Sequence, residues 1–151
     1  MAELVVWTDA LSVGVQELDD QHKTLIAMLN SLAEAIESGT SQHVRIGVFN
    51  KLFEYTQVHF AAEEKMMHSA RYPEYEEHKQ EHETLVAQVV QFREKLASDQ
   101  SLASTEFLMF LRKWLTNHIM KSDKAYEKHL RNPGKERSWI RRYFLDRFWS
   151  R

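Results

Sequence analysis

Four segments of the chain carry apolar side chains at alternating intervals of three and four residues. This is the spacing of helices that each bury one face, and no alternation typical of strands competes with it. Polar side chains able to bind metal ions occupy positions in these same stripes. They are His22, then His59 and Glu63, then His78 and His82, then His118. An unpartnered polar side chain in a core costs several kcal/mol, so a chain that places this many there must supply partners for them.

Glycine, proline and capping residues place the ends of the expected helices. Asp19 or Asp20 can cap the first helix, and Gly39 can take the left-handed conformation that ends it. Pro73 suits the first turn of the third helix, and Asn132-Pro133-Gly134 stops the fourth. The expected helices run from Asp19 or Asp20 to about Ser38, from about Gln42 to Ser69, from Pro73 to about Ala97, and from about Ser104 to Leu130.

Short connections between these helices predict an all-α fold, an up-down-up-down four-helix bundle. An extended N-terminal segment would precede it, and a short C-terminal amphipathic helix would follow. In this topology the starts of the first and third helices lie at the same end as the finishes of the second and fourth. The candidate metal-binding residues fall at these starts and finishes. They are therefore expected to converge on one level at one end of the bundle.

The intervals between candidate ligands decide which of them share a helix face. A residue four positions along the chain lies only about 40° past a full turn, so a pair at this spacing faces one side. Such pairs are His59 with Glu63, and His78 with His82. Asp123 follows His118 by five positions, which on a regular α-helix leaves the two about 140° apart. Helix geometry alone does not join Asp123 to His118.

The set of donors favours two metal ions held by nitrogen and oxygen. The chain has no cysteine, which excludes thiolate zinc sites and iron-sulfur clusters. Five imidazoles and two carboxylates are too many for one ion but suit two ions bridged by both carboxylates. With a solvent-derived oxygen as a further bridge, the ion with two imidazoles keeps an open position for a small molecule. Iron is favoured over zinc, with manganese as the alternative. His43, His68 and His129 are expected at the surface or in local hydrogen bonds.

Several motifs surround these residues in a fixed order. They are Trp7, Ser12-Val13-Gly14-Val15, Asp19-Asp20-Gln21-His22, His59-Phe60-Ala61-Ala62-Glu63-Glu64, His78-Lys79-Gln80-Glu81-His82, and Trp114-Leu115-Thr116-Asn117-His118-Ile119 with Asp123. This ordered set resembles the hemerythrin family, in particular its single-domain bacterial members. The resemblance implies one iron bound by His78, His82 and His118, and another bound by His22 and His59. It also implies that Glu63 and Asp123 bridge the two irons.

The function implied by this resemblance is reversible dioxygen binding at a non-heme diiron centre with an oxo or hydroxo bridge. The chain would then be an oxygen carrier, store or supplier and not an enzyme, with dioxygen as its partner. The alternatives are sensing of oxygen, nitric oxide or redox state, and a diiron oxidase or peroxide-handling enzyme. By resemblance and by nearness to ligands, the expected walls of the ligand pocket are Leu25, Phe60, Trp114, Leu115 and Ile119.

The distribution of charge divides the chain into two parts. Residues 1–132 form the expected diiron bundle, and residues 133–151 form a basic aromatic extension with six Lys or Arg and two Asp or Glu. The extension carries +4 and the whole chain −2, so the remainder carries −6. Its aromatic residues share one helix face, which suits packing on the acidic bundle or docking to a membrane surface or a protein.

The remaining expectations concern location and other partners. The N-terminal residues lack a basic leader followed by a long apolar stretch, and no segment reaches about 18 apolar residues, so the expected location is cytoplasmic. Nucleic-acid binding is not expected of an otherwise acidic domain. The sequence does not determine the oligomeric state.

Truncation after Asn132 distinguishes the two roles of the extension. If its aromatic side chains cover the bundle, the melting temperature falls, because each buried aromatic contributes on the order of 2 kcal/mol. If they serve a lipid surface or a partner, the truncated protein melts nearly as before but loses binding to anionic vesicles or to that partner. Calorimetry and vesicle sedimentation measure the two outcomes. Iron content is expected to persist in both, since all seven candidate ligands precede residue 124.

Overall fold

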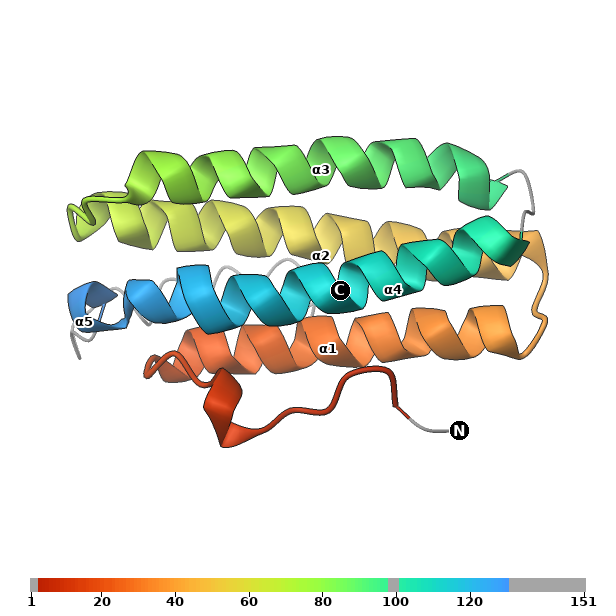
Figure 1. Cartoon of the computed structure of the whole chain (residues 1–151), viewed down its shortest axis with the longest axis horizontal. Helices are drawn as coiled ribbons and strands as arrows, with labels where there is room; N and C mark the ends of the chain where they lie inside the picture. Colours follow the sequence, from red (N-terminus) through yellow and green to blue (C-terminus); the bar gives the residue numbers. More distant parts are fainter. Residues whose placement is uncertain (1–2, 98–100, 131–151) are drawn as a thin grey trace, which may run out of the picture.

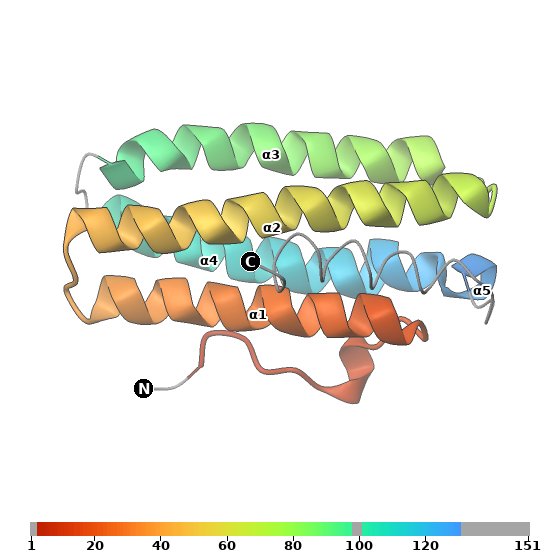
Figure 2. The same ribbon diagram turned by 180° about the vertical axis from the view of Figure 1, so that it is seen from behind.

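The computed structural model of the protein describes residues 3–97 and 101–130. Its long helices are α1 (Gln16–Glu37), α2 (Gln42–Ser69), α3 (Tyr75–Ala97) and α4 (Ser101–Asn117). Each helix packs on its neighbour in the chain, and α4 also packs on α1, so the four close into a ring (Figure 1). The view from behind shows the same antiparallel order (Figure 2). The predicted all-α, up-down-up-down four-helix bundle is confirmed.

The apolar stripes fill the space between the helices. Their buried members include Leu25, Leu29 and Leu32 of α1, Phe49 and Leu52 of α2, Leu85 and Val89 of α3, and Phe107 and Leu108 of α4. Burial of each such side chain stabilises the fold by about 1.5–3 kcal/mol. At one end of the bundle the stripes change from apolar to polar, and the candidate ligands lie there.

The N-terminal segment runs along α1, as Figures 1 and 2 show. It contains one short 3-10 helix, η1 (Asp9–Leu11), and is otherwise without regular helix in its described part. Asn30 of α1 holds it by accepting a hydrogen bond from Val5 N and donating one to Val5 O, at 3.0 and 2.9 Å. Val5, Leu11 and Val13 are buried. The segment therefore adds an apolar cover to the outer face of α1.

The start of α1 differs from the prediction. The helix begins at Gln16 after Val15, so neither Asp19 nor Asp20 caps it. The Asp19 carboxylate instead accepts hydrogen bonds from Val13 N and Ser12 Oγ, at 2.8 and 2.5 Å. A carboxylate inside the first turn thus reaches back to the chain that precedes the helix, as the glutamate of a capping box does, in place of capping the helix itself.

Two other helix boundaries were predicted from glycine and proline. Gly39 follows α1 in the left-handed conformation with φ 66°, as predicted. Pro73 lies in a turn two residues before Tyr75, where α3 begins, so the prediction that it occupies the first turn is wrong. Arg71 takes the left-handed conformation at φ 56° and reverses the chain in this connection. The connection is therefore longer than the sequence suggested.

The fourth helix is interrupted, contrary to the prediction of one regular helix from Ser104 to Leu130. After α4 the chain forms a π-helix, η2 (His118–Asp123), and then a short helix, α5 (Glu127–Leu130). A π-helix bonds residues five apart and is uncommon outside functional sites. Here both of its end residues are buried polar side chains. Their interactions in the polar cluster at one end of the bundle offset the cost of the wider turn.

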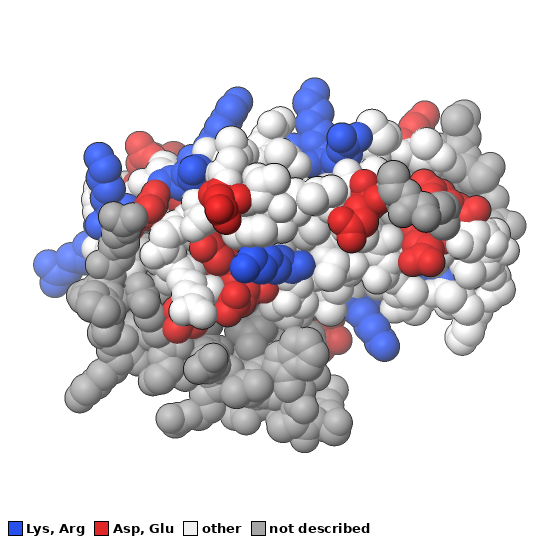
Figure 3. Space-filling view, turned by 90° about the horizontal axis from the view of Figure 1, so that it is seen from below, with Lys and Arg blue, Asp and Glu red and all other residues white. Residues whose placement is uncertain are grey.

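Other predictions concern the surface and the ends of the chain. Figure 3 shows acidic and basic side chains interspersed with uncharged surface on the face seen from below. In the described part of the chain, no helix is long and apolar enough to span a bilayer. The predicted C-terminal amphipathic helix and the extension 133–151 lie outside the described residues.

Candidate metal centre

All seven candidate ligands are buried at one end of the bundle. The most exposed, His118, has 6% of its surface accessible, and His22 and Glu63 have none. They come from α1 (His22), α2 (His59 and Glu63), α3 (His78 and His82) and η2 (His118 and Asp123). The starts of two helices and the finishes of the other two thus supply the side chains, as the topology predicted.

The side chains form two groups of potential metal ligands. One group comprises Glu63, His78, His82, His118 and Asp123, and the other comprises His22, His59 and Glu63. Within each group, one donor atom per residue lies within 4.8 Å of all the others. Such spacing allows the members of a group to surround a single ion. Glu63 belongs to both groups, so two ions held there would be close neighbours.

Each carboxylate presents one oxygen to each group. Glu63 Oε1 lies 2.9 Å from His78 Nε2 and 3.1 Å from His82 Nε2, while Oε2 lies 3.3 Å from His59 Nε2. Asp123 Oδ1 lies 3.0 Å from the Nε2 atoms of both His78 and His118. Its Oδ2 lies 3.1 Å from His22 Nε2. Each carboxylate thus lies between the two groups, with one oxygen directed at each.

The π-helix explains how Asp123 reaches the site. On a regular α-helix this residue would point away from His118, because five residues overshoot one turn by about 140°. A π-helix closes its turn over five residues, so the two side chains lie on one face. The structure brings them within 3.0 Å of each other.

The hydrogen bonds among these side chains leave several buried atoms unsatisfied. Within the described residues, both ring nitrogens of His22 and Oδ1 of Asp123 have no hydrogen-bond partner. Asp123 Oδ2 nevertheless lies 3.1 Å from His22 Nε2, and His78 Nε2 lies 3.0 Å from Asp123 Oδ1. His82 Nε2 and His118 Nε2 face each other at 3.1 Å. Buried polar atoms are normally paired, and a buried polar atom left without a partner calls for an explanation such as a bound ion. The donor set therefore fits metal ions better than it fits a self-contained polar core.

Outer partners orient three of the imidazoles. The Nδ1 atoms of His59, His82 and His118 lie 2.6, 2.8 and 2.9 Å from oxygens of Gln21, Glu64 and Glu81, respectively. An acceptor at Nδ1 keeps the proton there and turns the lone pair of Nε2 toward the centre, as metal ligation requires. Ser122 Oγ donates to the same oxygen of Glu81 at 2.6 Å. Three of the five imidazoles are thus held in the tautomer that can bind a metal ion.

Sequence reasoning missed three of the supporting residues. Gln21 and Glu81 are polar residues on helices, each beside a candidate ligand in the chain, and nothing in their spacing identified them as imidazole partners. Tyr126 is fully buried, and its hydroxyl donates to Glu63 Oε2 at 2.9 Å. Burial and the nearby carboxylates raise the pKa of Tyr126 well above its usual value, so the phenol keeps its proton. Its position three residues after Asp123, on the same side of a helix, was the available signal.

Burial and the carboxylates act in opposite directions on the imidazoles. Burial lowers the pKa of His22, His78 and His118, but Asp123 and Glu63 outweigh it and raise these pKa values to about 9, 10 and 9. Burial raises the pKa of Glu63, and the surrounding imidazoles, His59 foremost, hold it well below its usual value. Metal ions must therefore displace protons from this cluster, so metal affinity falls as the pH falls.

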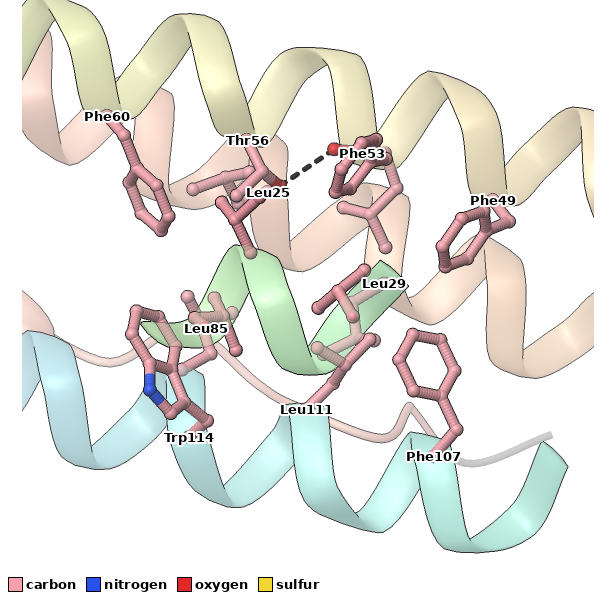
Figure 4. Close-up of a pocket in the computed structure, with 14 residues that line it drawn as sticks. Leu25, Leu29, Phe49, Phe53, Thr56, Phe60, Leu85, Phe107, Leu111 and Trp114 are labelled. Atoms are coloured by element: carbon pink, nitrogen blue, oxygen red, sulfur yellow. Dashed lines mark hydrogen bonds between the residues drawn. The ribbon is translucent and has the colours of Figure 1, made fainter. Parts of the chain in front are cut away.

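Aromatic rings and an apolar cavity adjoin the cluster. Phe60 stacks on His82 with ring centroids 3.7 Å apart, and Trp114 stacks on His118 at 4.3 Å. Both rings also line a cavity of about 50 Å³ in the bundle core (Figure 4). Leu25 and Leu115 line it as well, whereas Ile119 is buried but does not line it. Four of the five residues predicted to wall a ligand pocket thus meet around one hollow.

Comparison with known proteins identifies the fold family. A sequence profile described as the Hemerythrin HHE cation binding domain matches residues 13–130. The chain belongs to the hemerythrin family. Bacteriohemerythrin from Stenotrophomonas maltophilia is 38% identical over 124 residues, which cover 82% of this chain and 79% of that protein. Bacteriohemerythrin from Methylococcus capsulatus is 33% identical over 124 residues, covering 82% and 94% of the two chains.

Solved hemerythrin structures share this arrangement of helices. A crystal structure of wild-type hemerythrin matches with a TM-score of 0.78 at 33% identity, covering 85% of this chain and 99% of that one. A crystal structure of a leucine-to-alanine mutant of hemerythrin matches with a TM-score of 0.80 at 32% identity, covering 87% and 100%. Together with the buried histidine and carboxylate cluster, the hemerythrin domain is compatible with non-heme iron binding.

Replacing Glu63 or His82 by alanine is expected to lower the iron content sharply. Glu63 belongs to both groups of ligands, and loss of His82 leaves its buried neighbours unsatisfied. The exposed His43 of α2 provides the control, since His43→Ala removes an imidazole outside the cluster. Metal analysis of the purified proteins measures the effect. If the His82→Ala variant retained two irons, the assignment of α3 to the site would be wrong.

Proposed function

We propose that this protein reversibly binds dioxygen at a diiron centre, as an oxygen carrier, store or supplier. In this proposal one iron is held by His78, His82 and His118, and the other by His22 and His59. Glu63 and Asp123 bridge the irons together with an oxo or hydroxo group. The main support is that each carboxylate directs one oxygen to each of two unequal imidazole groups. The smaller group leaves one ion an open position for a small molecule.

The iron pair supplies two-electron exchange with dioxygen, and the protein determines whether that exchange is reversible. The cavity beside the cluster excludes water, because its lining is apolar except for Thr56. The Thr56 hydroxyl donates to Leu52 O of its own helix at 2.7 Å, as the dashed line in Figure 4 shows. No ionisable side chain lines the cavity. A dry space without ionisable side chains disfavours the release of reduced oxygen.

The same features support a binding protein over an enzyme. General acid-base catalysis needs a titratable group within hydrogen-bond reach of the reacting atoms. Tyr126, the buried phenol nearest the cluster, uses its proton in the bond to Glu63. Glu64 and Glu81 hold imidazoles at their outer nitrogens. These acids support the ligands and do not face the cavity.

Metal analysis together with optical spectra of the reduced protein, before and after exposure to dioxygen, tests this proposal. Two irons per chain and a near-ultraviolet and visible change that reverses on removal of dioxygen are the expected results. Continuous oxygen consumption in the presence of a reductant would instead indicate a diiron oxidase. Absence of any spectral change on oxygenation would contradict oxygen binding.

Leu115→Ala is expected to shorten the lifetime of the oxygenated protein several-fold. Leu115 lines the cavity one turn before His118, so a smaller side chain admits water close to the cluster. Leu111→Ala is the matched control, because Leu111 lines the same cavity one turn farther away. Both replacements are expected to cost on the order of 2 kcal/mol of stability. The lifetimes are measured from the decay of the oxygenated spectrum. If they were equal in the two variants, the assignment of Leu115 to the wall of the ligand pocket would be wrong.

A further inference from the structure

A surface groove between α2 and α3 lies directly outside the apolar cavity. The groove has a volume of about 280 Å³, and its lining includes Gln57, Glu64 and Glu83 as well as apolar side chains. Phe60 and Val86 line the groove and also line the internal cavity. Only these two side chains are common to both linings in the described part of the chain. They therefore form the wall between the solvent and the interior of the bundle.

The two side chains of this wall are held differently. The Phe60 ring lies parallel to the His82 imidazole, with an interplanar angle of 3°, and also approaches Trp114 at 5.9 Å between centroids. These contacts fix its position at the end of the cavity that Figure 4 shows beside Trp114. Val86 is partly exposed and has a short side chain without polar atoms. Val86 is thus the smaller and less tightly held of the two side chains in this wall.

A second hollow reaches the same end of the bundle but is a poorer route. It is a cleft of about 540 Å³ beside η2, and its lining includes Lys113, Lys121 and Glu81. It shares only Trp114 with the cavity, and that indole is stacked on His118. Passage there would require displacement of a large ring from a buried imidazole. The wall of Phe60 and Val86 is the smaller obstacle.

We propose that dioxygen enters and leaves the cavity from the groove between α2 and α3, past Val86 and against the fixed ring of Phe60. This inference rests on the proposed oxygen binding, and it adds the route and the residue that controls the rate. The polar rim and the apolar interior select the solute. Charged or strongly hydrated molecules stop at the rim because transfer into an apolar cavity without partners is costly, whereas an apolar diatomic gas passes.

A barrier on the route by which the gas both enters and leaves changes association and dissociation by the same factor and leaves the affinity unchanged. Val86→Trp fills the wall and is expected to slow both rates about tenfold, while Val86→Ala accelerates both. Val90→Trp is the matched control, because Val90 lies one turn along the same helix, is 44% exposed and lines neither hollow. Flash photolysis or stopped-flow measurement of oxygen binding gives the two rates.

Xenon provides a test that does not depend on oxygen binding. In the full-length purified protein, xenon is expected to occupy the cavity, and its exchange by xenon NMR is expected to be slower in Val86→Trp than in Val90→Trp. Equal exchange in the two variants, or no xenon binding, would overturn the route. A slower oxygen dissociation with unchanged association would also overturn it, since Val86 would then contact the bound gas. Failure of oxygen binding with slower xenon exchange would reject the proposed function and retain the route.

Discussion

The fold of this protein depends on two carboxylates shared between two clusters of imidazoles. Glu63 and Asp123 are buried, and in an apolar environment each would be strongly destabilising without partners. All four long segments of the bundle supply those partners, so the polar centre ties together every helix at one end. The rest of the core is an ordinary apolar packing that could tolerate several registers. The carboxylates select the one register in which each oxygen meets its imidazoles.

Much of this arrangement follows from the sequence, because helical periodicity and loop length are local properties. The apolar stripes predicted the four helices, and the predicted bounds of α2 match the structure. The antiparallel topology predicted that histidines far apart in the sequence lie at one level of the bundle. Other features depend on contacts across the fold. Asp19 was expected to cap α1, yet its carboxylate binds Val13 and Ser12 of the preceding chain. The bond between Gln21 and His59 spans 38 residues, and no pattern of spacing could have indicated it.

The cluster of candidate ligands also shows how outer contacts complete a site. Without outer contacts, the metal-free imidazoles could rotate and change tautomer. Gln21, Glu64 and Glu81 remove that freedom before any ion binds, and Phe60 and Trp114 hold two of the rings from their faces. A preorganised set of ligands loses less entropy on metal binding and tolerates a change of metal charge with little rearrangement. Rigidity of this kind suits a centre from which a bound small molecule must leave in the form in which it arrived.

The π-helix at His118–Asp123 has a consequence for the rest of the fourth segment. Before it, the buried side of the helix passes through Leu108 and His118, and after it the buried side passes through Asp123, Tyr126 and Leu130. An uninterrupted α-helix would have directed Lys121 and Ser122 inward instead, since each residue turns the helix by about 100°. One extra residue in one turn thus shifts the phase of everything that follows. A regular α-helix over the same residues would instead turn Asp123, Tyr126 and Leu130 away from the buried face together, so the wider turn, and not only the residue types, keeps these three side chains in the core.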